Sequence, residues 1–207
     1  MLEIIKDIPL IQDVKKYEVI LVGTNIYGRL SNGFQFDVGE DYPFVKVTDV
    51  NTRYGDPKKM GTIVECQEND SPIFVLMYIT KGYNFQPHKI KDYLDYESLE
   101  NCLKLINIKY KGKTIATTIP GVFPWDGNGD KDKILEILNK TLTDVNVFVY
   151  DYKALSNREI NSLKMHEKYK LILNKDKKGY KEFVKKLKND CKERTARRPN
   201  FDNGKTN

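Results

Sequence analysis

The sequence has few of the residues that build metal centres and disulfide frameworks. Among its 207 residues there are three cysteines and two histidines. Cys66, Cys102 and Cys191 lie far apart and form no Cys-x-x-Cys pair, and His88 and His166 are isolated from each other and from every cysteine. We therefore expect reduced thiols, as in a cytosolic protein, no metal site and no cofactor.

Long apolar runs are also missing. No run approaches the roughly 20 apolar residues that a membrane helix needs, and charges interrupt the N-terminal segment at once, unlike a signal peptide. Hydrophobic residues make up 40% of the chain and charged residues 31%, which allows a packed core and argues against global disorder. We expect a cytoplasmic protein without a membrane partner. Its frequent Lys, Asn, Ile and Tyr suggest an AT-rich genome, and if that genome is viral we expect the protein in the host-cell cytoplasm.

Charge is distributed unevenly along the chain. Residues 153–207 carry 17 Lys or Arg against 7 Asp or Glu, a net charge of +10, whereas residues 1–152 carry 18 against 22, a net charge of −4. We interpret residues 1–152 as one domain and residues 153–207 as a basic helical extension with a disordered tail. Three roles stay open for the extension: helices packed on the domain, binding of nucleic acid through phosphate contacts, or docking of an acidic protein.

Strand and helix patterns alternate in the first domain. Apolar, β-branched runs predict strands at 2–5, 18–22, 63–66, 73–79, 114–119 and 145–150. The polar turn at 68–72 predicts a hairpin. Apolar residues at helical spacing predict helices over 96–108 and from an Asp130 N-cap to Leu142. Long crossovers between strands predict an α/β fold of three layers around a mixed, mostly parallel sheet.

Ligands of such sheets bind at the carboxyl ends of the strands, so the loops that follow the strands are the candidate site. These loops are residues 23–34, 80–84 and 120–130. The first and third are rich in glycine and asparagine, which tolerate positive φ and allow backbone N–H groups to converge on an anion. The third also enters a helix N-terminus. The pattern predicts a phosphate site, with plain turns as the alternative.

The order and the sequences of these loops are more specific than their composition. Thr24-Asn25 is followed by Ser31-Asn32-Gly33-Phe34, then Tyr78-Ile79-Thr80-Lys81, then Ile119-Pro120-Gly121-Val122-Phe123, and the last strand ends in Val149-Tyr150. Over about residues 2–152 this resembles the macrodomain family, in particular the divergent group with the yeast-type ADP-ribose 1″-phosphatase and the terminal ADP-ribose protein glycohydrolase.

The resemblance implies a partner, ADP-ribose or an ADP-ribosylated macromolecule, and a set of residues that contact it. Asp7 would contact adenine, and the loops would hold the riboses and the diphosphate. The ligand-binding residues implied in this way are Asp7, Ile8, Gly28, Ser31, Asn32, Gly33, Phe34, Pro120, Gly121, Val122, Phe123 and Trp125.

The resemblance also implies three catalytic residues. Lys81 would attack C1″ of the distal ribose if burial favours its uncharged form, Asp126 would act as acid or base, and Asn25 would bind ribose hydroxyls. The plain alternatives are a solvated lysine, a turn aspartate and an asparagine that closes its own turn. The products would be free ADP-ribose from a modified macromolecule or from ADP-ribose 1″-phosphate. The single glycine of the Gly121 loop, where the family has Gly-x-Gly, and the lack of a loop histidine favour the alternative of a non-catalytic reader.

Overall fold

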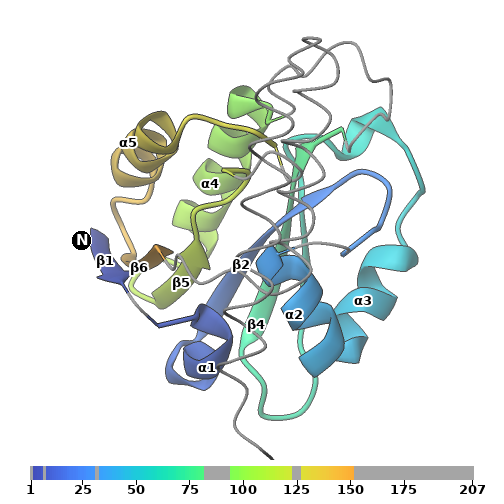
Figure 1. Cartoon of the computed structure of the whole chain (residues 1–207), viewed down its shortest axis with the longest axis horizontal. Helices are drawn as coiled ribbons and strands as arrows, with labels where there is room; N and C mark the ends of the chain where they lie inside the picture. Colours follow the sequence, from blue (N-terminus) through green and yellow to red (C-terminus); the bar gives the residue numbers. More distant parts are fainter. Residues whose placement is uncertain (1, 7, 31–32, 82–93, 123–126, 152–207) are drawn as a thin grey trace, which may run out of the picture. The chain divides into compact units, whose positions relative to one another are not determined.

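The computed structural model describes residues 2–6, 8–30, 33–81, 94–122 and 127–151 (Figure 1). The chain divides into two units, residues 1–160 and 161–207, and all the described residues belong to the first. The predicted basic extension therefore lies outside the described residues. The strands are β1 (Leu2–Lys6), β2 (Val19–Asn25), β3 (Ile63–Cys66), β4 (Ile73–Thr80), β5 (Thr114–Thr118) and β6 (Asn146–Asp151). The helices are α1 (Leu10–Asp13), α2 (Gly33–Asp41), α3 (Pro43–Val50), α4 (Tyr96–Lys109) and α5 (Lys131–Thr141), with short 3-10 turns η1 (Val14–Lys16) and η2 (Pro57–Lys59).

The six strands form one mixed sheet in the order β1-β6-β5-β2-β4-β3. Every neighbouring pair is parallel except β3 and β4, which form the predicted antiparallel hairpin. Asn69 takes a positive φ of 48° in the turn of that hairpin, as its short polar side chain permits. Because β2, β4, β5, β6 and β1 are parallel, their carboxyl ends all lie at one edge of the sheet.

Two apolar clusters fill the two faces of the sheet and confirm the predicted three layers. Helices α4 and α5 cover one face and α1, α2 and α3 cover the other (Figure 1). Strand β2 supplies both clusters by alternation, with Leu21 in the first and Val22 in the second. In α5 the predicted stripe is buried at Ile134 and Leu138, and the Asp130 side chain accepts the predicted N-cap bond from the N–H of Lys133 at 2.9 Å.

Two of the predicted loop segments are regular structure. Strand β2 continues to Asn25, so the segment that starts at Gly23 is strand before it is loop. Gly33 and Phe34 open α2, a helix that the sequence did not predict. The buried side of α2 includes Gln35 and Gly39, so the apolar stripe by which a helix is recognised is missing there.

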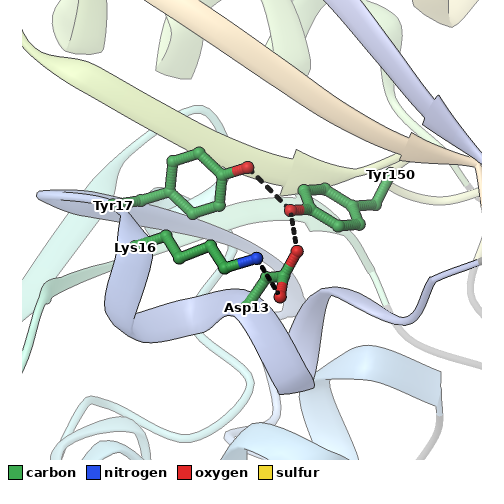
Figure 2. Close-up of polar contacts among 4 residues, drawn as sticks. All are labelled: Asp13, Lys16, Tyr17 and Tyr150. Atoms are coloured by element: carbon green, nitrogen blue, oxygen red, sulfur yellow. Dashed lines mark hydrogen bonds and ion pairs between the residues drawn. The ribbon is translucent and has the colours of Figure 1, made fainter.

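A polar network connects the segment of α1 and η1 to β6, the last strand along the chain (Figure 2). The hydroxyl of Tyr150 donates to Asp13 Oδ2 at 2.8 Å, and the hydroxyl oxygens of Tyr150 and Tyr17 are 2.6 Å apart. Since Tyr150 gives its only proton to the carboxylate, Tyr17 donates to Tyr150. Lys16 forms an ion pair with Asp13 at 2.8 Å, and the hydrogen bonds from Lys16 and Tyr150 hold the pKa of Asp13 below its usual value.

Candidate functional site

The ends of β2, β4 and β5 meet at the carboxyl edge of the sheet. Asn25 pairs with Thr80 across a register shift in β2, and the N–H of Ile26 donates to the carbonyl of Thr80 at 3.2 Å. On the other side, a Cβ added to Gly23 would lie 3.0 Å from Cβ of Pro120. The segment after β5 therefore packs closely on the backbone of β2 at Gly23, where a side chain would crowd Pro120. The described starts of the three loops that the sequence singled out are therefore close together.

The first loop is held in shape by the side chain of Asn25. Its Oδ1 accepts from the N–H of Tyr27 at 2.9 Å, and its Nδ2 donates to the carbonyl of Arg29 at 3.0 Å. With these bonds Asn25 closes its own turn, which is the alternative to a ligand-binding role that the sequence left open. An asparagine amide has two N–H donors and two lone pairs on its oxygen, so each end keeps capacity for a ligand.

Gly28 is the position of the first loop where glycine is required twice over. Its φ of +61° lies in the left-handed region, and an added Cβ would lie 3.1 Å from the carbonyl oxygen of Asp49 at the end of α3. The loop therefore rests its backbone directly on α3. Gly33, with a φ of 55°, follows as the first residue of α2, whose N-terminus carries the positive end of the helix dipole.

The third loop closes around Leu94, which the sequence did not single out. Leu94 is 4% exposed and its N–H donates to the carbonyl of Gly127 at 2.9 Å. A Cβ added to Gly121, Gly127 or Gly129 would lie 2.8, 3.1 or 2.5 Å from an atom of the Leu94 side chain. These glycines thus permit close packing around one leucine, and the positive φ of 71° at Gly121 turns the chain away from β5. Pro120 is buried beside them.

A buried polar cluster lies beneath the first loop, and sequence reasoning missed it. The hydroxyl of Tyr78 donates to Asp49 Oδ1 at 2.8 Å, and Lys59 Nζ donates to the carbonyl of Ile26 at 3.0 Å. Burial raises the pKa of Asp49, against a lowering by the Tyr78 hydrogen bond and the Lys59 charge. Burial lowers the pKa of Lys59, against the charges of Asp49 and Asp56. One weak signal was available, the single polar group that the Tyr78 hydroxyl adds to the otherwise apolar residues 73–79.

The remaining predicted site residues divide into two groups. Lys81 is exposed directly after β4, and Ile8, at 41% exposure, follows β1. Residues 82–93, which follow Lys81 in its loop, lie outside the described residues, so the nucleophilic role of Lys81 stays a prediction. Val122 is half-buried, and Phe34 packs against the cluster on the α2 face. Six predicted site residues lie outside the described residues, so their roles stay predictions: Asp7, Ser31, Asn32, Phe123, Trp125 and Asp126.

The described residues also bear on thiol chemistry, metal binding and membrane insertion. Cys66 and Cys102 are free thiols, and burial raises their pKa values to about 11 and about 12, so neither is a thiolate at neutral pH. Within the described ranges, no group of three or more His, Cys, Asp or Glu is placed to hold a metal ion. No helix in those ranges combines the length and apolarity that crossing a membrane requires.

Comparison with known proteins identifies the fold. No protein-family model and no curated protein matches the sequence. Among solved structures, the macrodomain of Thermus aquaticus DarG aligns with a TM-score of 0.54 at 15% identity, covering 73% of this chain and 98% of that one. The macrodomain of Mycobacterium tuberculosis DarG aligns with a TM-score of 0.55 at 14% identity, covering 72% and 97%. Thermosipho africanus DarTG in complex with ADP-ribose gives 0.51 at 16% identity, covering 70% of this chain and 41% of that longer chain. The chain therefore has the macrodomain fold, the α/β architecture that the sequence predicts.

Proposed function

We propose that the chain binds ADP-ribose or an ADP-ribose derivative at the carboxyl ends of β2, β4 and β5. The observation that carries the proposal is that the starts of three loops lie close together at this edge, through the Asn25–Thr80 pairing and the packing of Pro120 on Gly23. A solved structure of the same fold, Thermosipho africanus DarTG, holds ADP-ribose. Open α/β sheets bind their ligands at such an edge.

The chemistry of the edge suits a diphosphate. Left-handed glycines at Gly28 and Gly121 orient backbone amides in ways that other residues rarely adopt, and α2 begins at Gly33, so the positive end of its dipole lies at the end of the first loop. Lys81 adds an exposed positive charge at the end of β4. Backbone amides, a helix N-terminus and an ammonium are the donors that phosphate oxygens accept from.

We further propose that the bound derivative is hydrolysed at its distal ribose. Asn25 would orient ribose hydroxyls, and Asp126 would act as acid or base. Because Lys81 is exposed, we assign it the role of a charged donor to the departing group in place of a nucleophile. The substrate would be an ADP-ribosylated macromolecule or ADP-ribose 1″-phosphate.

A non-catalytic reader is the second candidate, and one observation favours it. The side chain of Asn25 already makes two hydrogen bonds within its own loop, to Tyr27 and Arg29. If the Asn25 side chain only closes its turn, ADP-ribose is bound in this loop by backbone groups. A reader would bind ADP-ribose as well as the hydrolase would, so binding and turnover need separate measurements.

Titration calorimetry of the full chain with ADP-ribose tests the binding proposal. We expect one saturable site, with AMP and ribose 5-phosphate binding more weakly because each offers only part of the ligand. Absence of binding heat and of ligand-induced thermal stabilisation would refute the proposal. Incubation with auto-modified ADP-ribosylated protein and with ADP-ribose 1″-phosphate then separates the candidates: release of ADP-ribose identifies a hydrolase, and binding without release identifies a reader.

A further inference from the structure

The buried cluster beneath the first loop does more than fill the core. Its members are Asp49, Thr52, Lys59 and Tyr78, contributed by α3, the segment after it, η2 and β4. We infer that Lys59 is a positioning residue for the ligand: its ammonium fixes the carbonyl of Ile26 from below and so holds the loop that follows Asn25. This inference rests on the proposed binding of ADP-ribose at that loop.

The contacts of Lys59 support this role. Lys59 is 8% exposed, and its Nζ donates to Ile26 O at 3.0 Å and to Thr52 Oγ1. It lies 4.1 Å from the centre of the Tyr78 ring, over its face. A buried ammonium costs free energy that a methionine of similar length would not. The contact that this group makes with the first loop is the one to the Ile26 carbonyl.

The Ile26 carbonyl is held at two points. It accepts from Lys59 Nζ at 3.0 Å and from the N–H of Gly55 at 2.9 Å. The N–H of the same residue donates to Thr80 in β4. The backbone of Ile26, the first residue after β2, is therefore bonded to β4 through its N–H and to η2 and the segment before it through its carbonyl.

Asp49 completes the support of the loop. It is fully buried, and its Oδ2 has no hydrogen-bond partner among the described residues, so the hydrogen bond from Tyr78 to Oδ1 and then the nearby charge of Lys59 offset the burial of this carboxyl. Its carbonyl oxygen is the atom on which Gly28 rests, and the same oxygen accepts from the Thr52 hydroxyl at 2.6 Å. Both Ile26 and Gly28 thus lie on one charged cluster, which sets where the loop presents its amides.

The test compares Lys59→Met with wild type by amide hydrogen exchange and by ADP-ribose titration. Two amides report on the loop: Tyr27, bonded to Asn25, and Gly55, bonded to Ile26. The Gly129 amide, bonded to Gly121, reports on the third loop. Lys113→Met is the matched control, because Lys113 forms an exposed ion pair with Glu18 at the opposite end of β5.

We expect Lys59→Met to raise exchange at Tyr27 and Gly55, to leave Gly129 unchanged, and to weaken ADP-ribose affinity about tenfold, the usual scale for a lost bond to a charged donor. Lys113→Met should change none of these. Unchanged exchange at Tyr27 and Gly55 overturns the inference, and so does an equal rise at Gly129, which would mark general loss of stability.

A second variant covers the case in which Lys59→Met does not fold. Lys59→Gln keeps a polar donor without the charge, and we expect a smaller change in the same direction at Tyr27 and Gly55. Unchanged exchange in that variant overturns the inference equally. If wild-type protein binds no ADP-ribose, the proposed function fails, yet the exchange pattern still decides whether Lys59 holds the loop.

Discussion

The carbonyl oxygen of Gly121 accepts a hydrogen bond from the N–H of Gly129 at 2.9 Å, which closes the loop between β5 and α5 on itself. The Leu94 side chain packs closely on both residues, because a Cβ added to Gly121 or Gly129 would lie 2.8 or 2.5 Å from one of its methyl carbons. The loop after β5 is therefore shaped by a leucine 27 positions earlier in the chain. Its glycines have a packing reason to be there, in addition to any contact with a phosphate.

Gly121→Ala should destabilise the protein by about 2 kcal/mol, because the new Cβ meets Leu94 and the residue keeps a left-handed backbone. The added Cβ would lie 2.8 Å from Leu94 Cδ1 at a φ of +71°. Leu94→Ala removes that clash at the cost of a cavity. In urea unfolding, the double variant should therefore lose less stability than the two single variants together. Strict additivity would show that Leu94 does not shape the loop.

Gly28→Ala should weaken ADP-ribose binding more than it weakens the fold. The substitution strains a φ of +61° and forces the loop off the carbonyl oxygen of Asp49. Gly112→Ala is a matched control: its φ is +79°, nothing lies within 4 Å of an added Cβ, and it precedes β5 at the opposite edge of the sheet. Both variants should lose roughly 1 kcal/mol of stability from backbone strain. Calorimetry should show weaker ADP-ribose binding for Gly28→Ala alone, and equal affinities would contradict the proposed site.

Much of the fold follows from patterns local in the sequence. The hairpin turn before Ile73 and the N-cap at Asp130 each depend on a few consecutive residues, so they could be predicted. The expectation that the loops share one edge followed from the prediction of a mostly parallel sheet alone. Helix α2 was missed because Gln35 and Gly39 lie on its buried side.

The features that tune the candidate site are non-local, and for that reason the sequence did not reveal them. Lys59 reaches Ile26 across 33 positions, and Tyr78 reaches Asp49 across 29. No spacing rule connects such residues, because their proximity is created by the packing of α3 and η2 against β4. The exposure of Lys81 likewise depends on where the chain goes after the strand ends.

Stability should fall in acid partly through Asp13. Hydrogen bonds from Lys16 and Tyr150 depress the pKa of this carboxyl in the folded state (Figure 2). A depressed carboxyl pKa contributes stability that is present above the unfolded value, near 4, and is lost as pH falls through the folded value. Urea unfolding between pH 2 and pH 6, roughly spanning that window, should show a smaller acid loss for Asp13→Asn than for wild type. Asp70→Asn, in the exposed hairpin turn, should retain the wild-type profile.

If nucleic-acid binding is the role of the basic segment 153–207, one of the three roles open for it, the binding should depend on salt and on this segment. Its net charge of +10 favours phosphate contacts, whereas residues 1–152 carry a net charge of −4. Fluorescence anisotropy with a labelled single-stranded oligonucleotide should show affinity that falls with salt for the full chain. The chain truncated after Tyr152 should lose this binding while it keeps ADP-ribose binding. Binding retained by the truncated chain would place the nucleic-acid contacts on the first domain.

Lys81 can be assigned by comparing two substitutions, Lys81→Ala and Lys81→Arg. An arginine keeps the positive charge and the donors but does not provide a nucleophilic amine. If Lys81 is a charged donor, as we propose from its exposure at the end of β4, Lys81→Arg should keep most of the release of ADP-ribose and Lys81→Ala should lose about a hundredfold to a thousandfold, the scale of one transition-state donor. A nucleophilic lysine would make both variants equally inactive and leave a covalent adduct in wild type that mass spectrometry detects after borohydride reduction. Full activity in Lys81→Ala would remove Lys81 from the chemistry and leave the hydrolysis to residues of the other two loops.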